Sequence, residues 1–129
     1  MKNLETHQDI EVLVNKFYKK VQTSEIGPFF TEIANVDWEK HLPKMYNFWR
    51  SVLFADVKFD GNPMAAHFPI NEKKAMEKRH FEIWIKLWKE TIDENFSGEI
   101  ADSAKTKAQN IANLMSYKME IATKLADKK

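Results

Sequence analysis

The chain contains no cysteine among its 129 residues. Disulfides, zinc–thiolate sites, iron–sulfur clusters, thiolate-ligated haem and thiol catalysis are therefore excluded. An excess of charge of one sign is also missing, because 20 Lys and Arg side chains face 19 Asp and Glu side chains, for a net charge of +1. Nucleic-acid-binding modules usually carry a clear basic excess, so this balance argues against nucleic acid as the main partner.

Long hydrophobic runs are missing too. No stretch reaches the roughly 20 apolar residues that a membrane-spanning helix needs. The first ten residues, MKNLETHQDI, lack the apolar region of a secretory signal. We therefore expect a cytoplasmic protein that does not enter a membrane.

Glycine and proline are scarce, with three and four copies, and little of the chain alternates like a strand. Apolar residues instead recur at helical spacing, as in Ile10, Leu13, Val14 and Phe17. This periodicity predicts one all-α domain over residues 1–129. Its main helices are expected at about residues 8–22, from 37 or 38 to 54, 81–94 and 99–126.

Two regions rich in proline complicate this pattern. Pro43 lacks the N–H of a helical bond and is best tolerated in a first turn, so we expect its helix to start close to His41 or to kink there. Pro63 suits a first helical position, whereas Pro69 biases the preceding residue away from helical geometry. Residues 64–67 should then form a very short, stiff helical segment, and the next helix could open as early as Asn71.

Aromatic residues are abundant, with nine Phe, four Trp and three Tyr. Their flat faces serve a core or the walls around a planar cofactor equally well. His67 lies on the short segment between prolines, which would hold its imidazole in one direction, as metal ligation requires. The alternative for His67 is a partly solvated histidine at a helix end, and the spacing leaves both open.

His41 falls on the apolar stripe of its helix, where a histidine is more often a core residue with a satisfied hydrogen bond than a ligand. The hydroxyl of Tyr18 and the indole N–H of Trp84 also need partners if buried, because an unpaired group costs roughly 1–3 kcal/mol. These three donors are placed among apolar residues and suit a small electronegative guest. The apolar neighbours are Phe17, Met45, Phe48 and Phe81.

Two basic residues are candidates for binding a carboxylate of a cofactor. Arg79 is the preferred one, and a surface role is favoured for Lys44. His80, next to Arg79, is the alternative metal ligand to His67. No zinc-binding or nucleophile-elbow motif is present.

Five blocks of sequence, in order over residues 9–98, carry a resemblance to a known family. They are DIEVLVNKFYKKV, IGPFF, WEKHLPKMYNFW, GNPMAAHFPI and HFEIWIKLWKETIDENFSG. Together they resemble the truncated haemoglobins of group III (group P), a branch of bacterial globins. The resemblance implies a two-over-two helical sandwich around haem b, the iron complex of protoporphyrin IX.

The resemblance also implies roles for individual residues. The proximal iron ligand falls on His67, and the distal ligand-binding residues fall on Tyr18, His41 and Trp84. His80 is disfavoured as the ligand because Trp84 would then lie one turn away on the same wall. The remaining cofactor-binding candidates are Phe17, Met45, Phe48, Arg79 and Phe81.

Three functions follow as hypotheses. The first is binding of O₂, and of CO or NO, at ferrous iron, with high affinity from a polar distal pocket. The second is a redox enzyme that acts on peroxide or detoxifies nitric oxide and needs an external reductase, because the sequence shows no reductase domain. The third is a helical interaction module without a cofactor.

Overall fold

The fold is described by a computed structural model that covers residues 1–127. Every regular element in this range is helical, which confirms the predicted all-α class. The elements in chain order are α1 (His7–Gln22), the π-helical turn η1 (Phe29–Ile33), α2 (Trp38–Leu53), α3 (Pro63–Lys73), α4 (Lys78–Asn95) and α5 (Glu99–Asp127). No helix within residues 1–127 is both long enough and apolar enough to cross a membrane.

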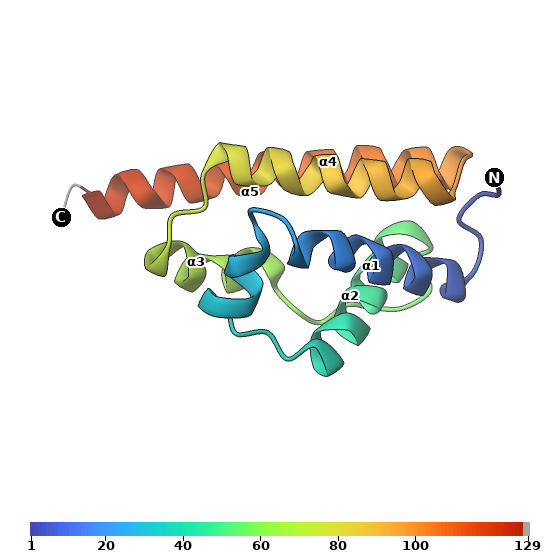
Figure 1. The fold of residues 1–129 in the computed structure, drawn as a ribbon, viewed down its shortest axis with the longest axis horizontal. Helices are drawn as coiled ribbons and strands as arrows, with labels where there is room; N and C mark the ends of the chain where they lie inside the picture. Colours follow the sequence, from blue (N-terminus) through green and yellow to red (C-terminus); the bar gives the residue numbers. More distant parts are fainter. Residues whose placement is uncertain (128–129) are drawn as a thin grey trace.

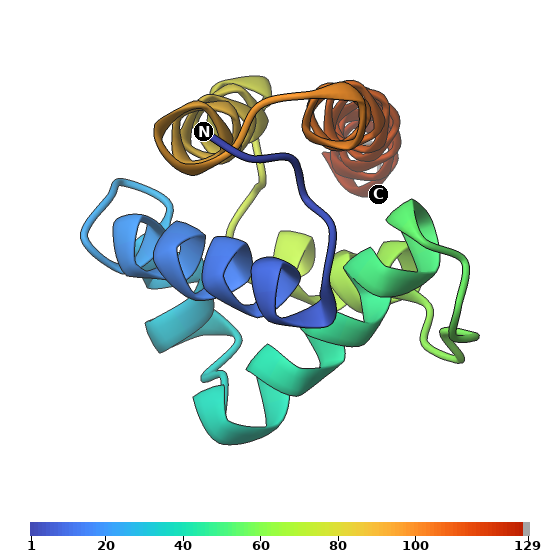
Figure 2. The ribbon, with the colours of Figure 1, turned by 90° about the vertical axis from the view of Figure 1, so that its right-hand side faces the viewer.

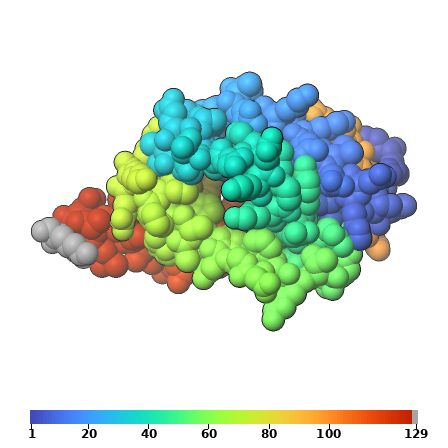
Figure 3. All heavy atoms as spheres, turned by 90° about the horizontal axis from the view of Figure 1, so that it is seen from below, coloured from blue at the N-terminus to red at the C-terminus, as the bar shows by residue number. Residues whose placement is uncertain are grey.

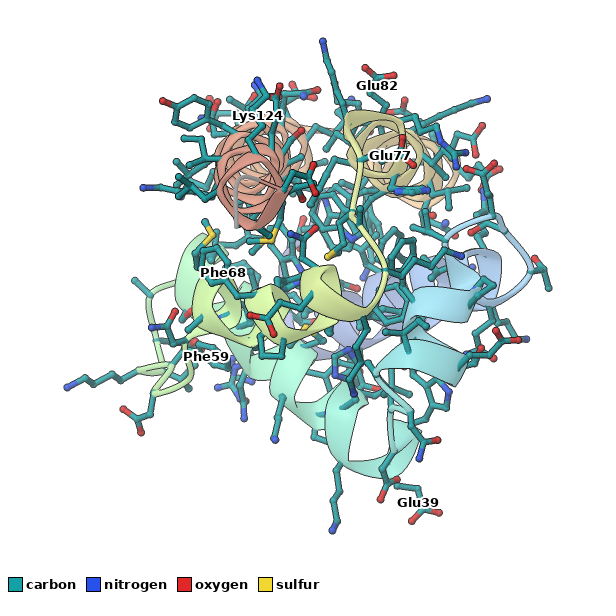
Figure 4. All side chains as sticks on the ribbon, turned by 90° about the vertical axis from the view of Figure 1, so that its left-hand side faces the viewer. Glu39, Phe59, Phe68, Glu77, Glu82 and Lys124 are labelled. Atoms are coloured by element: carbon teal, nitrogen blue, oxygen red, sulfur yellow. The ribbon has the colours of Figure 1, made fainter. Side chains whose placement is uncertain are left out.

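The long helices form two layers. Helices α4 and α5 run antiparallel beside each other and lie over α1 and α2, with α3 beneath the C-terminal half of α5 (Figures 1 and 2). The predicted two-over-two sandwich is therefore confirmed. Figure 4 shows Glu82 and Lys124 on the outer side of the α4–α5 layer and Glu39 at the opposite end of the molecule.

The core lies between the layers and follows the predicted apolar stripe of α1. Ile10, Leu13 and Val14 are fully buried there, as is Trp88 of α4. Helix α5 contributes small residues at this contact, namely Ala101, Ala104, Ala108 and Ala112. The indole N–H of Trp88 donates to the carbonyl of Ala104 at 3.2 Å and so joins α4 to this row of small residues.

Helix α1 begins with a capping box. The Thr6 hydroxyl accepts the N–H of Asp9, and the Asp9 carboxylate accepts the N–H of Thr6 and binds Lys2 at 2.8 Å. Burial opposes the ionisation of Asp9, but hydrogen bonds from Lys2 and from backbone N–H groups outweigh it and lower the pKa of Asp9 to about 2.

Helix α2 runs from Trp38 to Leu53, which confirms the extent expected from residue 37 or 38 to 54; the later start near His41, suggested by Pro43, is wrong. The Asp37 side chain caps the helix by accepting the N–H of Glu39 at 3.1 Å, and the His41 N–H donates to the Asp37 carbonyl at 2.8 Å. Pro43 therefore lies inside α2. Its missing N–H leaves only the carbonyl of Glu39 without a helical donor, and both residues are exposed to water.

Helix α3 is longer than the very short segment expected at residues 64–67, so that expectation is wrong. The helix starts at Pro63 under an Asn62 cap, but it continues through Pro69 to Lys73. Asn71 consequently belongs to α3 and does not open α4, which begins at Lys78. The carbonyl that loses its donor belongs to Ala65, which is exposed, so water can replace the missing bond.

Candidate functional site

A cavity of about 440 Å³ opens between the two layers. This volume lies within the ~300–1,000 Å³ that cofactor and ligand sites occupy. Figure 3 shows the hollow between the segment of α2 and the segment of α3. Its walls are mostly apolar and aromatic, and they include Phe17, Ile26, Phe29, Phe30, Met45, Phe48, Trp49, Phe59, Ile70, Met76, Phe81, Ile111 and Met115.

His67 forms part of the wall that α3 contributes. Its Nδ1 lies in hydrogen-bond contact with the carbonyl of Pro63, one turn earlier in the helix. A carbonyl can only accept, so Nδ1 must carry the proton and donate it. The neutral ring then has its lone pair on Nε2, free for a metal. A proton held on one ring nitrogen is the arrangement that metal-binding histidines use.

His80 also lines the cavity and is buried, but its hydrogen bonds are the reverse of those of His67. Its Nδ1 accepts the backbone N–H of Glu77 at 2.9 Å. Burial lowers the pKa of His80, and the charge of Arg79 acts in the same direction, which favours the neutral ring. The single proton of that ring must sit on Nε2, so neither nitrogen offers a lone pair. The geometry therefore favours His67 over His80 as a metal ligand.

Tyr18 of α1 and His41 of α2 meet on another part of the cavity wall. The His41 Nε2 lies 3.3 Å from the Tyr18 hydroxyl, and the two rings are T-shaped at 5.4 Å. Burial raises the pKa of Tyr18, so its hydroxyl keeps the proton. Burial also lowers the pKa of His41, helped by the charge of Lys44. A neutral His41 can donate from Nε2 to the Tyr18 oxygen and leave the Tyr18 O–H for a guest.

Trp84 of α4 lines the same cavity. It packs edge-on against Phe17 at 5.9 Å and lies parallel to Trp88 at 6.3 Å. Its indole N–H is a third donor that comes from a separate helix. The structure thus brings together, around one space, the three donors that the sequence analysis selected.

All but one of the predicted cofactor-binding residues line the cavity. The exception is Arg79, whose guanidinium pairs with Glu25 and lies 3.8 Å from Glu77. Lys44, for which a surface role was favoured, is a lining residue. By its place on the cavity wall, Lys44 is the better placed of the two for contact with a cofactor carboxylate, so we carry Lys44 forward beside the Arg79 prediction. The residues placed as predicted are Phe17, Tyr18, His41, Met45, Phe48, His67, Phe81 and Trp84.

Several lining residues were not selected from the sequence. Phe29 and Phe30 come from η1, and their apolar pair after Pro28 was the available signal. Ile111, Ala112 and Met115 come from α5. Periodicity predicted a helix over residues 99–126, but nothing local showed which of its residues meet the cavity.

Comparison with known proteins identifies the class. The model of the family described as bacterial-like globin matches residues 2–120. The chain therefore belongs to the bacterial-like globin family.

Two matches, one to a sequence and one to a solved structure, show which branch of the family the chain resembles. The chain is 28% identical over 110 residues to the group 3 truncated hemoglobin ctb of Campylobacter jejuni, over 82% of this chain and 84% of that protein. The crystal structure of the group III truncated hemoglobin from Campylobacter jejuni superimposes with a TM-score of 0.80 at 28% identity, over 92% of this chain and 95% of that one. These matches confirm the resemblance to group III truncated haemoglobins.

The globin family implies a haem cofactor, and the residues of this cavity fit one. His67 has a free Nε2 lone pair, held in direction by the bond from Nδ1 to Pro63. Flat apolar walls suit a planar macrocycle, and the cationic Lys44 side chain suits its carboxylates. Haem would therefore be held by His67, by the aromatic side chains and by Lys44.

Proposed function

We propose that this globin binds O₂ and other diatomic ligands reversibly and with high affinity at a haem held by His67. The observation that carries the proposal is the division of the cavity lining by hydrogen-bonding capacity. His67 presents a lone pair, whereas the Tyr18–His41 pair and Trp84 present donors. When bound, haem supplies the ferrous iron at which a diatomic ligand binds. We further propose haem b, because the chain has no cysteine for covalent attachment.

The proximal residues act by holding one nitrogen in place. Pro63 opens α3, and its carbonyl accepts the His67 Nδ1–H from the preceding turn. A hydrogen bond on the second nitrogen fixes the tautomer and raises the basicity of the ligating one. His67 thus already holds the tautomer that ligation through Nε2 would use.

The distal residues act on the guest. Bound O₂ carries partial negative charge, and a hydrogen bond to a charged acceptor contributes roughly 1.5–3 kcal/mol. Tyr18 and Trp84 can each donate one such bond, and His41 either supports the Tyr18 oxygen or donates itself. Two bonds at the lower end sum to about 3 kcal/mol, which slows O₂ release by about 150-fold.

The first experiment is visible spectroscopy of the purified protein. We expect a red protein whose Soret band shifts when CO is added to the ferrous form. His67→Ala should abolish the native iron ligation, whereas His80→Ala should preserve it. A colourless protein that takes up no added haemin would refute the proposal, as would native ligation in the His67→Ala variant. A colourless protein that takes up no haemin would favour the helical interaction module without a cofactor.

A second candidate function is redox turnover of hydrogen peroxide or nitric oxide. The observation that favours it is the lowered pKa of His41, whose neutral imidazole can accept a proton from peroxide in the cavity. Electrons for this turnover would come from an external reductase, a partner that we predict from the sequence. The cytoplasmic location is likewise a prediction from the sequence. Turnover faster than that of free haem, lost in His41→Leu, would support this function over simple binding.

A further inference from the structure

Helix α3, which carries His67, has very little buried apolar surface of its own. The only buried side chain between Pro63 and Lys73 is the polar Asn71, which is 7% exposed. The apolar side chains Met64, Phe68 and Ile70 are only partly buried. These three side chains pack against the core, but the one buried side chain on this helix is polar.

Asn71 instead ties α3 to two other segments by hydrogen bonds. Its Nδ2 donates to the Met119 carbonyl at 3.4 Å and to the Thr123 hydroxyl at 3.1 Å, both on α5. Its Oδ1 accepts the backbone N–H of Met76 at 2.8 Å, in the connection to α4. The side chain is thus satisfied on both its donor and acceptor sides. Its helix, α3, lies beneath the C-terminal half of α5 (Figure 1).

Asn71 lies close enough to His67 along α3 for its hydrogen bonds to attach the turn that carries His67. The two residues are four apart, so they lie one turn from each other on the same side of the helix. Between them, Pro69 removes the helical hydrogen bond to the carbonyl of Ala65. The turn that carries His67 is therefore weakened on its C-terminal side, where the Asn71 bonds supply an external attachment.

We propose that Asn71 is a positioning residue for the proximal ligand. Its bonds to α5 hold α3 so that the His67 Nε2 keeps one direction and one distance to the cofactor iron. This inference rests on the proposed function, because it takes His67 as the ligand. It adds an attachment outside the cavity, since Asn71 is not among the lining residues.

The test is the iron–histidine stretching band of the ferrous protein without a diatomic ligand, measured by resonance Raman. Asn71→Leu keeps a similar volume and removes all three hydrogen bonds, and Asn71→Asp keeps the acceptor for Met76 but removes the donor to α5. We expect both variants to shift or broaden the band and to release haem on the order of tenfold faster. Thr123→Val removes one partner and should move the band less, in the same direction.

The matched control is Asn95→Leu. Asn95 also makes two side-chain hydrogen bonds, to Thr91 and Lys16, but neither reaches α3. A general loss of stability would affect this variant too, yet its iron–histidine band should stay native. An unchanged band and haem-release rate in Asn71→Leu would overturn the proposal; if that variant fails to fold, an unchanged band in Thr123→Val would overturn it.

The failure of the proposed function has a different signature. If the native protein shows no iron–histidine band, or if His67→Ala retains it, the ligand assignment itself is wrong. A native band that depends on His67 but is insensitive to Asn71 and Thr123 refutes only the positioning role.

Discussion

Tyr18→Phe is the sharpest perturbation of the distal pocket, because it removes one oxygen and little else. The ring of Tyr18 packs against Phe17 at 5.0 Å and Phe30 at 5.7 Å, and a phenylalanine ring can keep both contacts. The hydroxyl has one protein partner, the His41 Nε2 at 3.3 Å. The variant should therefore fold normally and lose only the donation to the guest and the bond to His41.

The expected change in the O₂ dissociation rate follows from the one hydrogen bond that Tyr18 would donate to the guest. A hydrogen bond to a charged acceptor contributes roughly 1.5–3 kcal/mol, which corresponds to an O₂ dissociation rate about 10- to 150-fold faster in the variant. The assay is stopped-flow displacement of O₂ by CO from the ferrous protein. Loss of the hydroxyl acts on the bound state, so we expect the association rate to change much less than the dissociation rate.

Tyr46→Phe is the matched control for this prediction. Tyr46 lies on α2, its hydroxyl binds Asn15, and it does not line the cavity. Its removal should leave O₂ dissociation unchanged. An unchanged rate in Tyr18→Phe would refute the distal assignment, and so would an equal acceleration in both variants.

Three further predictions concern the cofactor contact, the core and the response to acid. Lys44→Ala should speed haem loss, whereas Arg79→Ala should leave the rate near the native value, because of these two residues Lys44 alone lines the cavity. Transfer of haem to an apoprotein acceptor measures the rate of haem loss in both variants. Faster loss from Arg79→Ala than from Lys44→Ala would contradict the geometry. Trp88→Ala should lower the free energy of unfolding by about 3–5 kcal/mol, since Trp88 is fully buried and stacks on Trp49 at 4.3 Å. Urea denaturation of the native protein and of the variant tests this value. A loss below about 1 kcal/mol would be inconsistent with it. The pKa of Asp9 is about 2 in the folded protein against an ordinary 3.8, so its stabilising contribution is complete above about pH 4 and disappears as the pH falls through 2. Asp9→Asn should therefore destabilise the protein at pH 7 but much less near pH 2, and an equal loss at both values would show that the carboxylate charge is not responsible.

The two internal prolines show where reasoning from the sequence was misleading. Rules for proline place Pro43 in a first turn and end a helix before Pro69. Both prolines and the carbonyls they leave unpaired belong to exposed positions, where water replaces the missing donor. Periodicity predicted the extent of α2 correctly, but it does not report whether a carbonyl faces water, so the continuation of α3 through Pro69 could not be read from it.

The two histidines of the proximal side show the opposite case. The family blocks already favoured His67 over His80, and the structure supplies an independent reason. His67 donates from Nδ1 to a carbonyl, whereas His80 accepts at Nδ1 from a backbone N–H. Each partner is three or four residues away, yet its role depends on the backbone conformation of the turn.

The sequence by itself determined the helical class and the apolar faces, and it supplied the side chains that we propose carry the chemistry, because a 3.6-residue period and side-chain type are local properties. It also determined the resemblance to group III truncated haemoglobins, through five ordered blocks. Only the tertiary structure decided which groups meet. Tyr18 and His41 are 23 residues apart and Asn71 and Thr123 are 52 apart, so their hydrogen bonds exist only because the helices pack into two layers. The same packing placed Lys44 on the cavity wall, turned Arg79 toward Glu25, and brought residues of α5 into a site that the sequence had assigned to the first four helical segments.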